Sequence, residues 1–291
     1  MHVFVTGATG WVGSALIEDL LSAGHRVTGL ARAPEKAQAL ADRGARIIAG
    51  SIDDHALLRT AAGEADAVAH TAFNHDWAHF AESAAQDERA IMALGDALEG
   101  TDTPLLVTSG ASGLASGRPA TEADRPDPSS VRRSEAAAQA LAARGVTVAA
   151  IRLPPTVHGV GETHGFVPML IRRARESGVS AYIEDGENRW SAVHRRDAAR
   201  LFCTVLDRGI ETPVYHAIAE EGIAFHRIAD AIGRQLGLPT ESRGADHFGW
   251  FARMAGGDAA ASSERTRATT GWNPTGPDLL TDLADPAYYA D

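Results

Sequence analysis

Three glycines near the start of the chain have the spacing of a phosphate-binding turn. Gly7, Gly10 and Gly13 follow an apolar run, residues 2–5, that is typical of a short buried strand. They lead into residues 14–23, whose apolar side chains recur with helical spacing. In such a unit the first glycine permits the tight turn, the second lets the backbone approach a pyrophosphate, and the third lets the helix pack closely. Because the helix start also attracts negative charge, the pattern predicts a dinucleotide site.

The end of the second expected strand distinguishes between the two nicotinamide dinucleotides. An Asp or Glu there binds the ribose 2′-hydroxyl of NAD, whereas a basic residue accommodates the 2′-phosphate of NADP. Residues 26–30 are the expected strand, followed by Ala31 and Arg32, with Lys36 one helical turn further on. Alternatively, Arg32 and Lys36 are only part of the start of a solvated helix. Because no acid competes for the position, we favour NADP(H) bound by Arg32 and Lys36.

Apolar runs and helical stretches continue to alternate along the first half of the chain. Further strands are expected at residues 46–49, 67–72, 105–112 and 146–151. This alternation predicts a parallel, doubly wound sheet with ligands at the carboxyl ends of its strands.

Two candidate contacts fall at those strand ends. Thr71 and Ala72 leave the fourth strand, and Asp53 follows the third. Asp53 either accepts a hydrogen bond from the adenine amino group or caps the next helix, and both interpretations stay open.

Composition and charge exclude several classes of partner. The formal net charge is -11 and no basic cluster occurs, which argues against nucleic acid and anionic membranes. No apolar run has the length of a membrane span, and the first strand leaves no room for a signal peptide. The one cysteine, Cys203, lies in an apolar helical pattern, which indicates a core position and a reducing cytoplasm. No His or Cys spacing suggests a metal, so the expected partner is a small molecule.

Five motifs together carry a resemblance to a known family. They are residues 6–13 (TGATGWVG), 50–53 (GSID), 70–72 (HTA), 152–159 (RLPPTVHG) and 193–199 (VHRRDAA). The chain resembles the extended short-chain dehydrogenase/reductase family, in its NAD(P)-dependent epimerase/dehydratase and dihydroflavonol-reductase-like branch.

That resemblance implies an α/β fold with a Rossmann-type doubly wound parallel sheet and a smaller C-terminal α/β substrate domain. The expected boundaries are residues 1–152 for the cofactor domain, with a return segment near 190–216, and residues 153–291 for most of the substrate domain. It also implies a nicotinamide cofactor and a possible homodimer. The residues expected to contact the cofactor are Gly7, Thr9, Gly10, Trp11, Val12, Arg32, Lys36, Asp53, Thr71, Ala72, Thr108 and Pro154.

The usual catalytic residues of the family are missing. Members carry a Ser or Thr beyond the fifth strand and a Tyr-x-x-x-Lys pair on the next helix, expected here over residues 129–144. Alignment places Val131 on the tyrosine and Glu135 on the lysine. The single lysine of the chain is Lys36, and none of its four tyrosines lies between the fifth and sixth strands, so no register restores the pair.

Other polar residues near these positions are the candidate catalytic groups. Gly110 occupies the usual serine position, with Ser109 before it and Ser112 after it. His158 stands where relatives carry a tyrosine-like residue beside the nicotinamide, and His75 is a further candidate acid.

Three accounts of the missing pair stay open. The protein reduces an imine, an iminium or an activated C=C bond, for which no tyrosine acid is needed and Glu135 would favour a cation. Alternatively, another acid serves carbonyl chemistry, or the protein binds NADP without turnover as a sensor or scaffold. An epimerase or isomerase that uses its cofactor transiently is a further alternative. We favour an NADP(H)-dependent reductase of a small organic substrate.

The C-terminal half offers a lid and a pocket wall. Residues 160–165 have the composition of a flexible lid, and residues 166–175 form an amphipathic helix expected to wall the substrate pocket. His194 and Asp197 are interpreted as structural. A bulky patch is expected to face the substrate or a partner subunit, and it comprises His247, Phe248, Trp250, Phe251 and Met254.

Overall fold

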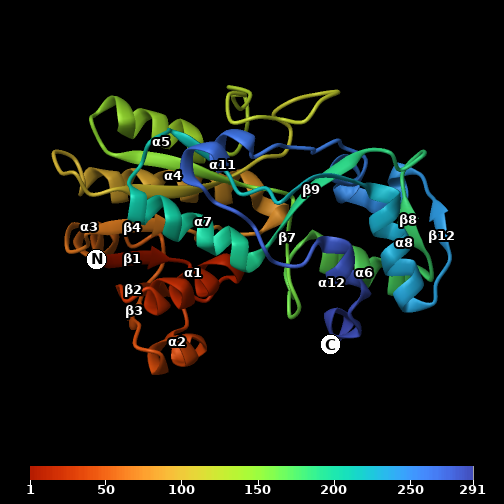
Figure 1. Cartoon of the computed structure of the whole chain (residues 1–291), viewed down its shortest axis with the longest axis horizontal. Coiled ribbons are helices and arrows are strands. Elements are labelled where there is room, and N and C mark those ends of the chain that lie inside the picture. Colours follow the sequence, from red (N-terminus) through yellow and green to blue (C-terminus); the bar gives the residue numbers. More distant parts are fainter. Residues whose placement is uncertain (291) are drawn as a thin grey trace.

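A parallel sheet of seven strands forms the centre of the first lobe in the computed structural model, which describes residues 1–290 (Figure 1). The strand order is β3-β2-β1-β4-β5-β6-β10, so the order reverses between β1 and β4. The strands are β1 (His2–Thr6), β2 (Arg26–Ala31), β3 (Arg46–Ala49), β4 (Ala67–His70), β5 (Leu105–Gly110), β6 (Val148–Leu153) and β10 (Val214–His216). In doubly wound sheets, ligands bind where the order reverses. The predicted Rossmann-type fold is confirmed.

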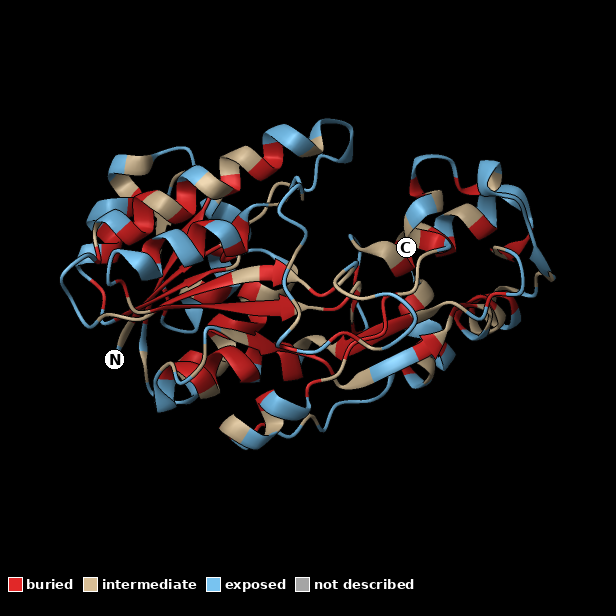
Figure 2. Ribbon diagram, turned by 90° about the horizontal axis from the view of Figure 1, so that it is seen from above, coloured by how far each residue is buried: buried red, intermediate tan, exposed pale blue. Residues whose placement is uncertain are grey.

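Helices cover both faces of this sheet, and successive strand residues face alternate layers. Val3 and Val5 pack in the core beneath one helical layer, whereas Phe4 packs in the core beneath the other. The first layer contains α1 (Trp11–Ser22) and α7 (Arg195–Arg208), and the second contains α3 (His55–Gly63), α4 (Phe80–Asp96) and α5 (Ser134–Ala143). The inner strands are therefore buried on both sides, and they are accordingly continuous apolar runs (Figure 2), whereas the edge strand β3 has no buried residue.

Two small sheets and a group of helices build the second lobe. One sheet has the order β11-β9-β7, and the other pairs β12 with β8. The strands are β7 (Thr156–His158), β8 (Ser180–Tyr182), β9 (Arg189–His194), β11 (Glu220–Ala224) and β12 (Thr240–Ser242). The helices are α6 (Phe166–Ser177), α8 (Phe225–Leu236), α9 (Ala245–Phe248), α10 (Ala252–Ala255) and α12 (Leu279–Ala284). Trp190 and Phe225, both fully buried, lie in the core of this lobe.

The chain returns from the second lobe to the first more than once. After β9, helix α7 packs against α1 and β10 adds a seventh strand beside β6. Later, α11 (Glu264–Thr270) lies against β10 and α7, and Trp272 joins the core of the first lobe. Short turns complete the chain: η1 (Pro34–Ala37), α2 (Gln38–Asp42), η2 (Trp77–His79), η3 (Gly249–Phe251) and η4 (Pro286–Tyr289).

Two expected boundaries are wrong. The helix expected from residue 129 begins at Ser134, because Asp127 accepts hydrogen bonds from both the backbone N–H and the hydroxyl of Ser129 and holds a turn there. The sixth strand runs over Val148–Leu153, two residues later than expected, because Gly145 and Val146 still bond back to the preceding helix. Within residues 1–290, no helix combines the length and the apolar composition needed to cross a bilayer.

Candidate cofactor and substrate site

The glycine turn after β1 has no room for side chains at two of its glycines. Gly7 has a φ of 72°, and a Cβ there would lie 2.8 Å from the backbone nitrogen of Ala72. A Cβ at Gly13 would lie 2.2 Å from the carbonyl oxygen of Gly7 and 2.7 Å from the Thr71 hydroxyl. Helix α1 therefore approaches the turn as closely as the spacing predicts, beside Thr71 and Ala72 at the end of β4.

The first turn of α1 is open to an anion. Gly10 is the N-cap residue, and no side chain caps this end of the helix. Thr9 and Gly10 are exposed, and Val12 is half-buried just inside the helix. The unpaired N–H groups of this first turn fit a dinucleotide pyrophosphate.

Arg32 and Lys36 follow the carboxyl end of β2, the strand end that meets the adenosine ribose in dinucleotide-binding folds. Arg32 follows β2 directly and is exposed, and its guanidinium makes no ion pair or hydrogen bond with any other residue of 1–290. Lys36 is exposed in the short turn that follows. Both basic groups are free for a ligand.

Asp53 does not cap the following helix. The N-cap residue of α3 is Asp54, whose carboxylate accepts from the backbone N–H of Leu57 at 3.1 Å. The Asp53 carboxylate instead accepts from the Gln86 amide at 2.6 Å. The capping alternative is therefore wrong, and Asp53 stays exposed at the end of β3.

A buried chain of hydrogen bonds connects β1 to the start of α5. The Thr6 hydroxyl lies 2.8 Å from His70 Nδ1, and His70 Nε2 lies 3.0 Å from the Asp87 carboxylate. Since a carboxylate only accepts, His70 Nε2 donates to Asp87. The second oxygen of Asp87 accepts from the Ser134 hydroxyl at 2.6 Å, and Ser134 accepts from Arg132 Nε at 3.1 Å. Arg132 is thus held in place by groups deep in the first lobe.

The guanidinium of Arg132 lies across the carboxyl ends of β4 and β5. Its Nη2 donates to the carbonyl oxygen of Thr108 at 3.0 Å, and its Cζ lies 4.4 Å from the ring centre of Phe73. The hydroxyl of Thr108 is itself bonded to the carbonyl of His70 at 2.8 Å. Desolvation lowers the pKa of Arg132, although the charges of Asp87 and Glu135 oppose this. An arginine keeps its proton at neutral pH, so a cation occupies this strand edge.

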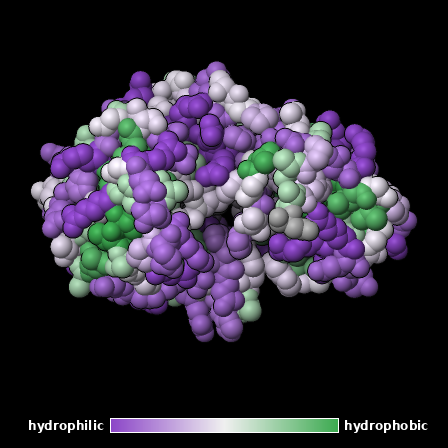
Figure 3. Space-filling model, turned by 90° about the horizontal axis from the view of Figure 1, so that it is seen from below, coloured by the Kyte–Doolittle hydropathy of each residue, from purple (hydrophilic) through white to green (hydrophobic). Residues whose placement is uncertain are grey.

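A series of aromatic side chains runs from this edge to the second lobe. We call it the aromatic wall, comprising Phe73, His75, Trp77, Phe166 and Trp250. The ring centres of Phe73 and His75 lie 5.2 Å apart and those of His75 and Trp77 lie 5.8 Å apart. Trp77 stacks on Trp250 at 5.6 Å and lies 5.4 Å from Phe166, so the wall joins the two lobes. The surface is hollowed between the lobes (Figure 3).

Glu135 is not available to a cationic substrate. Its two carboxylate oxygens accept from Nε and Nη2 of Arg152, each at 2.8 Å, and both side chains are buried. Arg152 also donates to the carbonyl of Asp124 at 2.8 Å and lies 3.0 Å from His216 Nε2. The proposed role of Glu135 beside an iminium is therefore wrong, because its charge is already neutralised inside the first lobe.

His158 does not line an open site. It is fully buried, with Nδ1 2.6 Å from the Asp282 carboxylate and Nε2 3.6 Å from that of Glu220. Burial alone would lower the pKa of His158, but the hydrogen bond to Asp282 and the nearby charges of Asp282 and Glu220 outweigh it and raise that pKa. Its predicted catalytic role is wrong, because its ring is enclosed at the joint between β7 and α12.

The side chain of Trp11 also joins the lobes. Its indole N–H donates to the carbonyl of Val157 at 2.7 Å, and the Arg195 guanidinium covers its ring at 3.9 Å. Only its backbone N–H, in the first turn of α1, is left to a cofactor. Pro154, one residue beyond β6, is buried.

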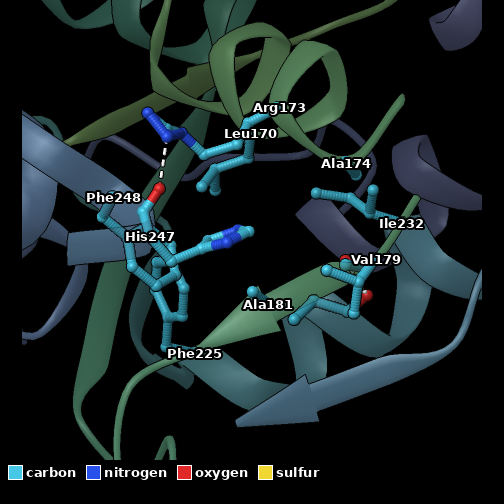
Figure 4. A pocket seen from close by; sticks show the side chains of 11 residues that line it. Leu170, Arg173, Ala174, Val179, Ala181, Phe225, Ile232, His247 and Phe248 are labelled. Atoms are coloured by element: carbon cyan, nitrogen blue, oxygen red, sulfur yellow. Dashed lines mark hydrogen bonds between the residues drawn. The ribbon is translucent and has the colours of Figure 1, made fainter. Parts of the chain in front are cut away.

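The expected bulky patch divides into core and surface. Phe248 and Phe251 are buried in the second lobe, whereas Trp250 is 61% exposed and belongs to the aromatic wall. His247 and Phe248 border a pocket of about 10 Å³, next to Arg173, which donates to the His247 carbonyl (Figure 4). This volume holds about one water molecule, so the pocket is too small for a substrate.

Cys203 is buried, and burial raises the pKa of its thiol to about 12, which fits the predicted core position. Among residues 1–290, no group of three or more His, Cys, Asp or Glu side chains is arranged to hold a metal ion.

The comparison with known families agrees with the glycine turn after β1 and with the parallel sheet. The model of the NAD dependent epimerase/dehydratase family matches residues 3–218. The chain belongs to this family. The cofactor of the family is a nicotinamide dinucleotide, and the glycine turn and the free N-terminus of α1 fit that group.

Two relatives share the whole length of this epimerase/dehydratase chain. Uncharacterized protein C2A9.02 of Schizosaccharomyces pombe (strain 972 / ATCC 24843) is 43% identical over 296 residues, covering 99% of this chain and 100% of its own. Uncharacterized protein YLL056C of Saccharomyces cerevisiae (strain ATCC 204508 / S288c) is 39% identical, covering 97% and 98%. Among solved structures, DesIV, a dTDP-glucose 4,6-dehydratase from Streptomyces venezuelae with NAD and TYD bound, has a TM-score of 0.80 at 19% identity, covering 99% and 97%. That likeness shows the shared fold.

Within this epimerase/dehydratase chain, the positions of the tyrosine and the serine in the resemblance are open, whereas the lysine position, Glu135, is buried. Val131 is 51% exposed, and a Cβ at Gly110 would meet no atom within 4 Å. Ser109 is buried at the end of β5 and Ser112 is half-buried beyond it. Their catalytic roles stay predictions. Sequence reasoning missed Arg132, because the alignment drew attention to its neighbours at the expected tyrosine and lysine positions.

Proposed function

We propose that the protein is an NADP(H)-dependent oxidoreductase that reduces a small organic substrate without a Tyr-x-x-x-Lys pair. The observation that carries the choice of NADP(H) is Arg32, a free guanidinium directly after β2 with Lys36 one turn beyond. Bound there, the cofactor supplies hydride. The chain's own residues hold its pyrophosphate at α1 and its 2′-phosphate at Arg32.

The charge at the strand ends favours a substrate that gains negative charge. Glu135 is neutralised by Arg152, and the charged side chain at the edge of β4 and β5 is the cation Arg132. A fixed cation stabilises an oxyanion or an enolate and disfavours an iminium. An activated C=C bond conjugated to a carbonyl therefore fits the site better than an imine.

Removing the Arg32 guanidinium tests the cofactor assignment. We expect Arg32→Ala to weaken NADPH binding about 10- to 100-fold, because a charge-assisted hydrogen bond to phosphate contributes about 1.5–3 kcal/mol. NADH binding should change less than twofold. Arg43→Ala removes another surface arginine, which pairs with Glu18 at 3.1 Å, and it is the matched control. Equal losses for both cofactors in calorimetric titrations would remove the 2′-phosphate assignment.

Turnover separates this proposal from a redox-silent NADP-binding protein, a role that the missing catalytic pair also fits. Consumption of NADPH should be followed with enones, ketones and cyclic imines. Oxidation with enones supports the reductase. Tight binding without oxidation of NADPH on any of them would favour a sensor or scaffold, and retained cofactor without net consumption would favour an epimerase.

A further inference from the structure

Arg132 lies beside Phe73 at the start of the aromatic wall, and its hydrogen bonding is incomplete within residues 1–290. Nε donates to Ser134 and Nη2 donates to Thr108, but Nη1 makes no hydrogen bond with any described residue. No carboxylate of residues 1–290 forms an ion pair with it, since Ser134 stands between Arg132 and Asp87. In a chain of net charge -11, an unpaired and half-buried guanidinium is poised to bind an anion.

Its position is fixed before any ligand arrives. The chain from Thr6 through His70, Asp87 and Ser134 holds Nε, while the Thr108 carbonyl holds Nη2. Phe73 packs against one face of the guanidinium plane. A donor held from two sides offers its remaining N–H groups without the entropy cost of ordering a free arginine.

The neighbouring surface suits the body of a planar ligand. Trp77 is 38% exposed and Trp250 is 61% exposed, and both rings belong to the aromatic wall that begins beside Arg132. His75 is also exposed, yet the pKa of its ring is lowered, first by desolvation from its packed neighbours and then by the charge of Arg132. Near neutral pH it is therefore an uncharged ring, which does not compete with Arg132 for an anion.

We propose that Arg132 binds the carboxylate of the substrate, and that the substrate is a conjugated or aromatic carboxylate whose plane packs against the aromatic wall. This inference rests on the proposed function, because it places the ligand at the same strand edge as the nicotinamide end of the cofactor. It adds a substrate class and a specificity-determining residue.

Calorimetry with two matched probes tests the inference. trans-Cinnamate and cinnamyl alcohol share a planar conjugated body and differ in the carboxylate. With the wild-type chain and saturating NADP+, we expect cinnamate to bind at least 10-fold more tightly than the alcohol. Equal affinity for the two probes, or binding of neither at millimolar concentration, would overturn the proposal.

Variants of Arg132 and Trp77 then test separately how the charge and the aromatic wall contribute to binding. Arg132→Gln should remove the preference for cinnamate, and Arg132→Lys should keep part of it, because a lysine supplies the charge without the planar donor pair. Arg133→Gln is the matched control, since Arg133 is the exposed neighbour that lies 3.4 Å from Glu88. Trp77→Leu should weaken both probes equally. A preference for cinnamate that survives Arg132→Gln in a folded protein would contradict the assignment.

The same titrations separate this inference from the cofactor proposal. NADP+ is titrated first, and each probe is titrated with and without it. A wild-type chain that does not bind NADP+ contradicts the proposed function. A chain that binds NADP+ but binds cinnamate and cinnamyl alcohol equally contradicts only the role of Arg132.

Discussion

Gly13 shows how one missing side chain sets the distance between a helix and a turn. The Cβ of any other residue would lie 2.2 Å from the Gly7 carbonyl oxygen, which is backbone and cannot rotate away. The N-terminal turn of α1 would then move off the strand, and the N–H groups that face the pyrophosphate would move with it.

We therefore expect Gly13→Ala to weaken NADPH binding at least 10-fold and to lower the melting temperature by several degrees. Gly63→Ala is the control, because a Cβ at Gly63 meets nothing within 4 Å. Fluorescence titration with NADPH measures the first effect and circular dichroism the second. Wild-type affinity in a folded Gly13→Ala protein would show that the helix start does not hold the cofactor.

Sequence reasoning predicted cofactor contacts at the glycine turn and at Arg32 but missed Arg132 for a physical reason. The glycine turn and Arg32 are features of local chain geometry, so spacing alone is enough to suggest them. Arg132 depends on Thr108, 24 residues away, and Glu135 finds Arg152 17 residues away. These pairings form only when α5 docks on β5 and β6, and no local pattern encodes them. The family alignment even suggested a lysine site at Glu135, where a lysine would face the buried Arg152.

A buried carboxyl group, that of Glu162, connects the loop after β7 to η4 near the end of the chain. Glu162 is buried, and the Tyr288 hydroxyl donates to its carboxylate. A Cβ at Gly165 would lie 1.8 Å from Glu162 Oε1, so the loop closes tightly around this side chain. The loop expected to be a flexible lid is therefore anchored from inside.

Burial raises the pKa of Glu162 to about 7, against an opposing hydrogen bond from Tyr288. Its ordinary pKa is 4.5, so between pH 4.5 and about 7 the folded chain binds more protons than the unfolded chain. The contribution of Glu162 to the free energy of unfolding is therefore fully present below pH 4.5, and it is lost as the pH rises through about 7. Glu162→Gln keeps an acceptor for Tyr288 and should flatten the fall in melting temperature over this window. The variant should be more stable at pH 8 by about 3 kcal/mol.

Exposed Glu176 on α6 supplies the control, Glu176→Gln, whose pH profile should follow the wild type. Thermal unfolding at pH 5, 6, 7 and 8 makes the comparison. An unchanged slope in Glu162→Gln would show that the carboxyl titrates elsewhere in the pH range.

At the scale of the molecule, hydrogen bonds tie the two lobes together. The indole N–H of Trp11, on α1 of the first lobe, donates to the carbonyl of Val157, on β7 of the second lobe. Asp197 of α7 accepts from the backbone N–H groups of Thr275 at 3.1 Å and Gly276 at 2.7 Å, on the segment that leads to α12. The second lobe therefore has few ways to open while the first stays folded.

Thermal unfolding should accordingly show a single transition. Far-ultraviolet circular dichroism reports on the helices of both lobes. Fluorescence reports on the five tryptophans, which are distributed over the two lobes. The two melting temperatures should agree within about 2 °C in a domain pair of this size. A fluorescence transition well below the loss of helix would show that the lobes unfold separately.

The late return of β10 to the sheet has a consequence for synthesis on the ribosome. When residue 153 has emerged, β6 is an edge strand with one side unpaired, and it stays so until Val214–His216 follow. At about 5–20 residues per second, that interval lasts roughly 3 to 13 s, and throughout it the unpaired edge of β6 can pair with strands of other chains. Trp272, which joins the core of the same lobe, arrives later still. A gene cut after residue 153 would leave that edge of β6 unpaired, so we expect the cofactor half of this protein to aggregate when it is expressed alone.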